Sequence, residues 1–226
     1  MTGHAPSALD VAGLGYRLGG RTLFQDVNMR VAPGRSIVVT GPSGSGKSTL
    51  LMCLLGLCKP SAGRITVDGQ EITRMWPRAR ARLRRTTMGM VFQDGELLPE
   101  LSPVENVALA ALLAGRGRRD AYPNAQRLLD DLGVPYAHTR TDDLSGGERQ
   151  RTAVARALIT EPTVLLADEP TGALDPESRD NVAETLFSLP RERGCALLVV
   201  THDRHVAGYG DQRVRLDAGH LAEVAG

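Results

Sequence analysis

The stretch that decides the fold begins with Ser36-Ile-Val-Val-Thr40, continues with Gly41-Pro-Ser-Gly-Ser-Gly-Lys-Ser48 and ends with Thr49–Leu57. The first segment is an uninterrupted apolar run of strand length, and the third has the apolar content of a buried helix. The middle segment contains the pattern G-x-x-x-x-G-K-[ST], formed by Gly41, Gly46, Lys47 and Ser48. The order strand, glycine loop and helix predicts a phosphate-binding loop. The alternative is a Gly/Ser turn that merely starts a helix.

The residue types in this loop match the demands of phosphate binding. Glycines let successive backbone N–H groups converge on phosphate oxygens, and the following helix points its positive end at the same place. Lys47 is one of only two lysines among 27 basic residues, the other being Lys59. A lysine is a slim point charge that can reach between β- and γ-phosphates, whereas arginine is a broader planar fork. The hydroxyl of Ser48 suits Mg²⁺.

A second segment, Thr163-Val-Leu-Leu-Ala-Asp168-Glu169, is an apolar strand that ends in two acids. Because an unpaired buried charge is costly, buried strands do not end in adjacent carboxylates without a partner. Asp168 fits as the acceptor that holds Mg²⁺, directly or through water. Glu169 would sit nearer the substrate and orient a water molecule for attack on the γ-phosphate. The alternative is a solvated Asp-Glu turn. The presence of a phosphate loop in the same chain favours the Mg²⁺ and water-orienting roles over this alternative.

The composition is that of a globular protein. The chain has 226 residues, of which 42% are apolar and 23% charged, and its formal net charge is +1. This balance gives no long-range field that would hold nucleic acid as the main partner. The longest apolar run, Val107–Ala114, is too short to span a bilayer, and Met1–Asp10 lacks the features of a secretory signal. Cys53, Cys58 and Cys195 form no even framework and no CxxC pair, so we interpret them as reduced core residues.

The N-terminal part of the chain has a short β-like pattern. Turns at Gly19-Gly20 and Pro33-Gly34 delimit three expected strands, which are Leu9–Tyr16, Thr22–Phe24 and Asn28–Val31. Ile65–Ile72 is expected to form a hairpin, with Asp68-Gly69 as its turn. This part of the chain therefore predicts an antiparallel β subdomain.

Farther along, expected strands alternate with expected helices. The strands are Met88–Phe92, Thr163–Ala167, Cys195–Val200 and Gln212–Leu216, and the clearest helices are Pro103–Leu113 and Asp120–Leu132. This alternation implies a mainly parallel sheet covered on both faces. We therefore predict an α/β fold with a mainly parallel sheet, an N-terminal antiparallel β subdomain and a helical insert. Residues 1–8 are predicted to be a flexible leader, residues 9–226 a single domain, and residues 97–160 approximately its helical subdomain.

The most specific motif of the chain is Leu144-Ser-Gly-Gly-Glu-Arg-Gln-Arg151. Ser145 is a good N-cap, and Gly146 and Gly147 expose backbone N–H groups at the start of an expected helix, Glu148–Ala157. The octet is therefore either a second anion-binding helix end or a simple helix cap.

Together with the phosphate loop and the acids that end the later strand, this octet makes the chain resemble the nucleotide-binding subunit of ATP-binding cassette (ABC) transporters over about residues 9–220. The resemblance implies a P-loop NTPase core that binds ATP and Mg²⁺ and hydrolyses ATP. It implies a head-to-tail homodimer in which each copy closes the other's ATP with its octet. It also implies separate transmembrane permease subunits, no nucleic-acid partner and a peripheral location at the cytoplasmic face of the inner (plasma) membrane. The implied cofactor-binding residues in the two motifs are Gly41, Pro42, Ser43, Gly44, Ser45, Gly46, Lys47, Ser48, Thr49, Ser145, Gly146 and Gly147.

Four further positions match the family one by one. Tyr16 matches the aromatic residue that stacks on adenine, and Gln93 matches the glutamine that senses Mg²⁺ and the attacking water. Asp175 matches the loop that touches the opposite copy, and His202 matches the switch histidine that contacts the γ-phosphate. The alternatives are packing for Tyr16, a helix cap for Asp175 and a structural role for His202. The implied catalytic residues are Glu169, His202 and Gln93, and the implied metal-site residues are Ser48, Gln93 and Asp168.

The sequence defines the process that ATP hydrolysis would power less closely than it defines the ATPase itself. The segment Leu97–Val107 and the short C-terminus resemble the lipoprotein-release and macrolide-export branch, which exports or extracts lipophilic or peptide cargo. The alternative is the ATPase of a non-transporting membrane complex of the cell-division type, which regulates cell-wall hydrolases. The segments Arg140–Asp143 and Asp94–Pro103 depart from the usual family pattern and leave partner and cargo open. The arginine-rich run Pro77–Arg85 is interpreted as a solvated helix face, with contact to lipid headgroups or a partner as the alternative.

Overall fold

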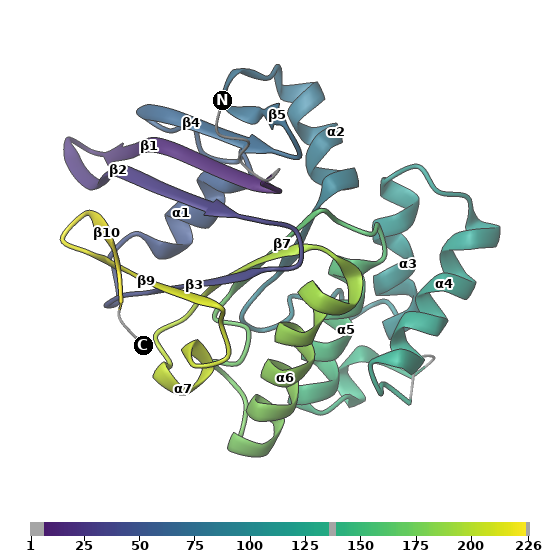
Figure 1. The fold of residues 1–226 in the computed structure, drawn as a ribbon. Coiled ribbons are helices and arrows are strands. Elements are labelled where there is room, and N and C mark those ends of the chain that lie inside the picture. Colours follow the sequence, from purple (N-terminus) through teal and green to yellow (C-terminus); the bar gives the residue numbers. More distant parts are fainter. Residues whose placement is uncertain (1–6, 136–138, 225–226) are drawn as a thin grey trace.

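The structure is a computed structural model that describes residues 7–135 and 139–224. Its strands form two sheets (Figure 1). The first sheet is antiparallel and has the order β2-β1-β4-β5, made of β1 (Leu9–Leu18), β2 (Arg21–Val31), β4 (Ala62–Val67) and β5 (Gln70–Glu71). The second has the order β10-β9-β3-β8-β7-β6, made of β3 (Ser36–Thr40), β6 (Met88–Val91), β7 (Val164–Asp168), β8 (Ala196–Val200), β9 (Gln212–Asp217) and β10 (His220–Glu223). Every pair in the second sheet is parallel except β9 with β10.

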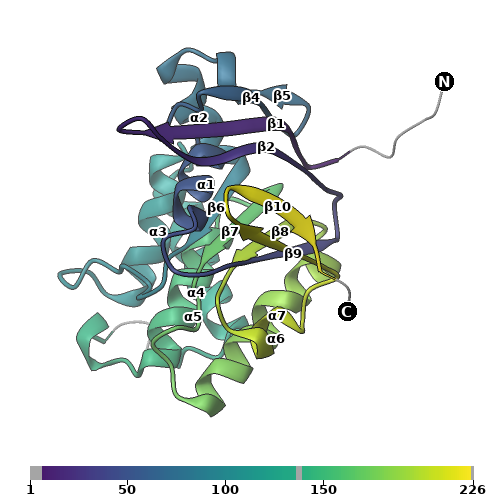
Figure 2. The same cartoon turned by 90° about the vertical axis from the view of Figure 1, so that its left-hand side faces the viewer.

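The helices fall into two groups around these sheets. Between the sheets lies α1 (Lys47–Leu54), as Figures 1 and 2 show. Later in the chain come η1 (Ile72–Arg74) and α2 (Pro77–Thr87), and α2 leads into β6 and packs on it. The opposite face of the second sheet is covered by α5 (Gly146–Leu158), α6 (Pro176–Arg193) and α7 (Arg204–Ala207). Two further helices, α3 (Pro103–Leu113) and α4 (Arg118–Asp131), pack against each other and against α5, and the short η2 (Thr141–Asp143) precedes α5.

Alternation along the central strands divides the apolar side chains between two cores. In β3, Ile37 and Val39 join the core around α1, whereas Val38 joins the core around the later helices. The strand β8 divides in the same way, with Leu198 on one side and Leu197 on the other. Such strands are buried on both faces, which is why they appear in the sequence as continuous apolar runs rather than as alternating patterns.

The helical insert begins with α3, and hydrogen bonds at the N-terminus of this helix fix its start. Ser102 and Glu105 form a capping box at the start of α3, as Pro103 at the first helical position favours. The side chain of Asn106 is 1% exposed and accepts from the Leu98 N–H at 2.8 Å while donating to the carbonyl of Leu101 at 3.1 Å. This buried carboxamide ties the preceding loop to α3, because an unpaired amide there would be costly.

The structure confirms the predicted α/β class, the antiparallel N-terminal sheet and the mainly parallel second sheet. The predicted 68–69 hairpin turn is also confirmed, since Asp68 and Gly69 have φ values of 48° and 72°, as a type I′ turn requires. Residues 1–6 lie outside the described part of the chain. Ala8, in the predicted leader, is buried and donates its backbone N–H to the carbonyl of Val31 at 2.9 Å.

Most element boundaries shift by one or two residues, and three elements differ from the sequence prediction more clearly. The segments expected at 22–24 and 28–31 are one strand, β2, because register shifts and a positive φ at Asp26 hide the alternation without ending the pairing. Helix α1 begins at Lys47 and ends at Leu54, earlier at both ends than the predicted Thr49–Leu57. The strand β10 was not predicted, because its side chains are mostly exposed and carry no apolar run.

Gly89 of β6 supplies a stability test, because a Cβ there would overlap the carbonyl oxygen of Ala157 in α5. We expect Gly89→Ala to lower the free energy of unfolding by about 1–3 kcal/mol, the usual cost of overpacking. Denaturant unfolding measures the change. The matched control is Gly117→Ala, whose added Cβ has no neighbour closer than 3.9 Å. Equal stability of the two variants would contradict the close packing of β6 on α5.

Candidate active site

The site lies at the carboxyl ends of three adjacent parallel strands, β3, β8 and β7. Asp168 pairs in register with Val200, so that Glu169 follows beside Thr201 and His202. A cavity of about 620 Å³ opens at this edge. The residues that line it are Leu23, Ser43, Gly44, Gly46, Lys47, Ser48, Thr49, Gln93, Glu169 and His202. The parallel sheet therefore brings together the phosphate loop, one of the two predicted acids and the predicted histidine.

The phosphate loop is folded by close backbone packing. Gly41 has a φ of 156°, and a Cβ there would overlap the carbonyl oxygen of Leu216 in β9. The ammonium of Lys47 donates to the carbonyls of Gly41 at 2.9 Å and Pro42 at 3.1 Å, and the residue is 8% exposed. The hydroxyl of Ser45 is buried without a hydrogen-bond partner among the described residues. The loop thus offers a buried cation and an unused donor, both of which suit an anion.

Asp168 and Ser48 form the part of the site that suits a divalent cation. Burial raises the pKa of the Asp168 carboxyl, and the charge of Glu169 raises it further, against a hydrogen bond from Ser48 and the charge of Lys47. Its Oδ1 atom is buried with no hydrogen-bond partner among the described residues. An unused carboxylate oxygen beside a hydroxyl is an oxygen donor set of the kind that Mg²⁺ takes. The described residues contain no cluster of three or more His, Cys, Asp or Glu side chains that could hold a metal alone.

Glu169 is fixed by its neighbours on β8. Its Oε2 atom accepts from the hydroxyl of Thr201 at 2.9 Å and from the N–H of His202 at 3.3 Å. Its Oε1 atom lies 2.8 Å from Nδ1 of His202. The backbone of Glu169 has a φ of 45°, a region that is strained for a residue with a side chain. The carboxylate side chain is 15% exposed and the imidazole 70% exposed, so the histidine is the more accessible member of the pair.

Gln93 enters the cavity from the loop after β6. It is exposed, and its side chain lies against Gly172, where an added Cβ would approach its Nε2 atom to 3.3 Å. Helix α5 holds the surrounding loop, because Gln150 donates to the carbonyl of Phe92 at 2.9 Å. Arg156 donates to the carbonyl of Gly95 at 2.6 Å. Burial lowers the pKa of this guanidinium.

Three residues that matter for the site were not singled out by the sequence analysis. Thr201 directly precedes the predicted histidine, and its position at the end of an apolar strand was the signal that could have found it. Gln150 and Arg156 lie within and just after the conspicuous octet, but nothing in the sequence indicates that they reach the carbonyls of the loop after β6.

Two other predicted site residues lie outside this cavity. The ring of Tyr16 stacks on Phe24 with 6.0 Å between centroids, and the neighbouring Cys58 raises the pKa of its phenol. Asp175 caps α6, accepting from the N–H groups of Glu177 at 3.1 Å and Ser178 at 3.0 Å. The hydrogen bonds from Ser178 lower the pKa of Asp175. Within one chain these two residues therefore have packing and capping contacts.

The octet forms the N-terminal end of α5. Within one chain this helix end lies away from the cavity. Ser145 caps α5 by accepting from the N–H of Glu148 at 3.2 Å, and the Glu148 carboxylate accepts from the Ser145 N–H at 2.8 Å. This is a capping box, as the spacing of the two residues requires. Gly146 and Gly147 lie against Leu174 and α6. None of Ser145, Gly146 and Gly147 lines the cavity around the phosphate loop.

The family model described as ABC transporter matches residues 24–172. The chain belongs to this family. It is 43% identical over 204 residues to the lipoprotein-releasing system ATP-binding protein LolD 2 of Caulobacter vibrioides, with 90% of each chain covered. It is 46% identical to LolD of Oleidesulfovibrio alaskensis, with 88% of this chain and 87% of the relative covered. It is 45% identical to the uncharacterized ABC transporter ATP-binding protein YbbA of Escherichia coli, with 90% of each chain covered.

A solved structure agrees with the sequence relatives. The dimeric post-hydrolysis structure of the ATP-binding cassette MJ0796 bound to ADP and Pi superimposes with a TM-score of 0.84 and 32% identity, covering 96% of this chain and 99% of the other. The chain is thus the ATP-binding subunit of an ABC transporter and hydrolyses ATP, which confirms the predicted function and reaction. Within residues 7–135 and 139–224, no helix combines the length and the apolar character that crossing a bilayer demands.

Asp168 provides a test in which stability and binding move in opposite directions. Because its folded pKa is raised, ionised Asp168 destabilises the nucleotide-free fold at neutral pH. We expect Asp168→Asn to raise Tm at neutral pH, because the neutral amide avoids the cost of burying a charge. This gain should shrink as the pH falls through the raised pKa toward the ordinary aspartate value, because the wild-type carboxyl then becomes neutral.

The same variant should lose the part of its ATP affinity that depends on Mg²⁺. Calorimetric scans and ATP titrations with and without Mg²⁺ measure the two effects. Asp130→Asn, at an exposed position of α4, is the matched control. A lower Tm for Asp168→Asn at neutral pH would contradict the proposed cost of its charge.

Proposed function

We propose that two copies of this chain pack head to tail and enclose ATP at two shared sites. Each site would combine the phosphate loop of one copy with Ser145, Gly146 and Gly147 of the other. The proposal is supported by the separation of the two predicted anion-binding helix ends within one chain, since only the one at the phosphate loop borders the cavity. The dimeric state of the similar MJ0796 cassette supports it as well. Asp175 would then contact the opposite copy while capping α6.

Binding would use groups that are already in place. The backbone N–H groups of the loop and the hydroxyl of Ser45 would hold the phosphate oxygens. Lys47 would exchange its loop carbonyls at 2.9 Å and 3.1 Å for the β- and γ-phosphates. Ser48, Asp168 and Gln93 would hold Mg²⁺, directly or through water, and the ion would neutralise developing charge on the phosphates. Tyr16 would supply an aromatic surface for adenine, with its ring supported by Phe24.

Hydrolysis would depend chiefly on Glu169, and its placement in one cavity with Lys47 and Ser48 carries the proposal. Its carboxylate would orient a water molecule and accept the water's proton as the oxygen attacks the γ-phosphorus. The bond from that phosphorus to the bridging oxygen would break, giving ADP and phosphate. His202 lies 2.8 Å from the carboxylate and is largely exposed, so it can hold Glu169 while also contacting the γ-phosphate.

Gln93 would transmit conformational change from the ATP site to the rest of the chain. Its loop is held by Gln150 and Arg156 of α5, and the first turn of this helix carries the octet. Occupation of the cavity would therefore be sensed by the same helix that closes the partner's ATP. Closing and opening of the pair would be a population shift driven by binding and hydrolysis.

The names of two relatives support a proposal for the transported cargo. Both are named as ATP-binding proteins of lipoprotein-releasing systems, at 43% and 46% identity. We therefore assign this chain to the release or export of a lipid-anchored cargo by a separate permease, at the cytoplasmic face of the inner membrane. The relatives' names favour this assignment over regulation of cell-wall hydrolases.

Replacing the proposed base tests the reaction. Glu169→Gln should bind ATP normally and hydrolyse it on the order of a hundredfold more slowly, because the amide cannot accept the proton. ATP titration and phosphate release measure the two properties. The matched control is Glu192→Gln, at an exposed position of α6. Near-normal turnover of Glu169→Gln would reject the assigned role.

The same variant tests the shared site, because blocked hydrolysis should trap the closed pair. Light scattering should find a dimer of Glu169→Gln with ATP and a monomer without it. Adding Ser145→Arg should abolish the dimer while leaving ATP binding to the single chain unchanged. A dimer that survives this second change would contradict closure by the octet.

Removing the loop cation tests binding itself. Lys47→Ala should weaken ATP binding by roughly 10- to 100-fold, as expected for loss of a buried charge-assisted contact. Lys59→Ala is the matched control, because Lys59 is the other lysine of the chain and is exposed. Isothermal titration compares the two variants. An unchanged affinity of Lys47→Ala would exclude the phosphate cradle.

A further inference from the structure

The outer face of α2 carries a stripe of arginines that the ATP site does not use. Arg78, Arg82 and Arg85 recur at helical spacing and are exposed. They therefore lie along one side of the helix over about two turns. Residues 72–93 contain six arginines and no acidic residue. The positive charge is local, since the whole chain has a formal net charge of only +1.

Other arginines nearby have partners, but this stripe has none among the described residues. Arg84 donates to the carbonyl of Leu55 at 3.1 Å, and Arg80 packs on Gly56. In the turn between α3 and α4, Arg116 pairs with Glu161 at 3.2 Å, and at the start of α4 Arg118 lies over the ring of Tyr122. No ion pair or hydrogen bond joins the side chains of the stripe to any residue within 7–135 and 139–224.

Helix stability does not account for this arrangement. Trp76 occupies the N-cap of α2 and makes no capping hydrogen bond, although Ser, Thr, Asp or Asn would cap the helix better. Arg78 lies in the first turn, where the helix dipole disfavours a cation. Like charges three and four residues apart repel one another. Burial lowers the pKa of Arg84, and the charges of Arg80 and Arg85 lower it further. Arg85 lies in the last turn, where the dipole favours a cation, so the cost to helix stability comes from Arg78 and from the repulsion between like charges.

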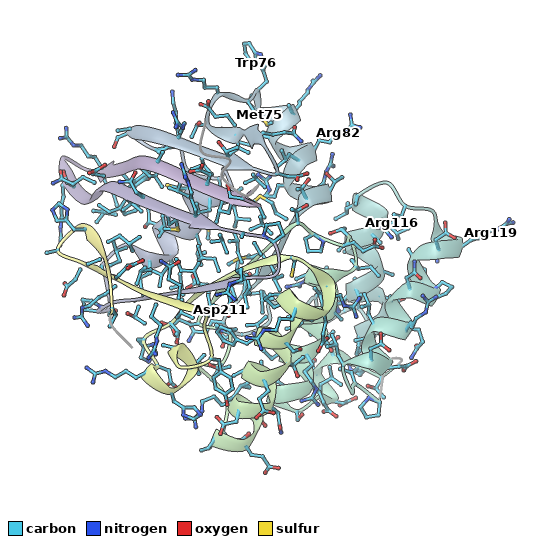
Figure 3. All side chains as sticks on the ribbon, viewed as in Figure 1. Met75, Trp76, Arg82, Arg116, Arg119 and Asp211 are labelled. Atoms are coloured by element: carbon cyan, nitrogen blue, oxygen red, sulfur yellow. The ribbon has the colours of Figure 1, made fainter. Side chains whose placement is uncertain are left out.

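An exposed aromatic side chain precedes the stripe. Trp76 is 83% exposed and is the only tryptophan of the chain. Figure 3 shows it projecting from the start of α2, next to Met75, while Arg82 projects from the same helix farther along. A tryptophan has an apolar ring and one polar N–H, which suits the boundary between lipid headgroups and acyl chains.

We propose that Trp76 and the arginine stripe, Arg78, Arg82 and Arg85, bind anionic phospholipid headgroups of the membrane in which the permease resides. The proposal rests on the proposed function for placing the chain at the cytoplasmic membrane face. Unpaired arginines on a convex helix face attract an anionic surface without needing a shaped partner. The adjacent tryptophan adds apolar insertion, which free phosphate would not exploit. Bound to such a surface, the stripe exchanges mutual repulsion for attraction to lipid phosphates.

The single tryptophan makes the test direct, because all tryptophan fluorescence comes from Trp76. The full-length protein without nucleotide is mixed at low salt with vesicles of phosphatidylcholine alone or of phosphatidylcholine with phosphatidylglycerol. Emission should shift to shorter wavelength only with the anionic vesicles, and lipids brominated near the headgroup should quench it. High salt should reverse the shift, because the Debye length falls from about 8 Å at physiological ionic strength to about 3 Å at 1 M.

Two triple variants then distinguish binding by the arginine stripe from non-specific attraction of a positively charged protein to anionic vesicles. The triple variant Arg78→Gln, Arg82→Gln and Arg85→Gln should reduce vesicle partitioning on the order of a hundredfold, or about fivefold for each arginine. The control triple variant Arg127→Gln, Arg191→Gln and Arg193→Gln removes equal charge from exposed positions on α4 and α6 and should bind as the wild type does. Trp76→Ala should weaken sedimentation with anionic vesicles while leaving Tm unchanged.

The outcomes that overturn the proposal are distinct from failure of the ATP site. No shift and no sedimentation with anionic vesicles at low salt would refute lipid binding, as would equal losses in the two triple variants. If the stripe variant bound vesicles normally but no longer remained in the purified complex with its permease, the surface would belong to a protein contact instead. ATP binding of every variant is measured in parallel. Because none of these residues borders the ATP cavity, failure of the ATP proposals would leave the vesicle result unchanged.

Discussion

Parallel pairing of β3 with β8 and of β8 with β7 is the constraint on which the site depends. Because the three strands run the same way, the loops that leave them emerge at one edge. Lys47, Glu169 and His202 are far apart in the sequence, yet they border one cavity for this reason. The two apolar cores hold the strands from both faces, so the geometry of the edge is set by packing that involves none of the polar groups.

The polar groups at that edge are arranged at some cost to the isolated chain. Asp168 keeps an oxygen buried without a partner, Ser45 keeps a hydroxyl in the same state, and Glu169 has a strained backbone. Each feature is unfavourable alone and would become favourable in the proposed complex, where a nucleotide and Mg²⁺ would supply the missing partners. Stability has therefore been exchanged for readiness to bind, as is usual where a site must be preorganised.

Much of this arrangement could be predicted from the sequence, because its strongest signals are local. The apolar run before Gly41 and the apolar run before Asp168 are strands in the structure, and the phosphate loop and the cap at Ser145 lie where their patterns indicated. The continuity of β2 could not be predicted, since its pairing with β1 continues through register shifts that break the alternation. Polar β10 is formed by pairing with β9 rather than by its own pattern.

Side-chain partners were harder to predict than elements. The sequence places Tyr16 and Asp175 in the family pattern, but within one chain they contact Phe24 and the start of α6. Their proposed roles depend on adenine and on a second copy, and neither can be derived from the contacts of a single chain. The hold of Thr201 on Glu169 likewise depends on strand register, which local pattern does not specify.

Helix α5 holds the loop after β6 through the backbone of that loop. Gln150 and Arg156 donate to main-chain carbonyls and not to the loop's side chains. Substitutions of the loop's side chains can therefore change the surface of the loop without removing its hydrogen bonds to α5. The sequence of this loop can therefore diversify among related proteins while its attachment to α5 stays the same.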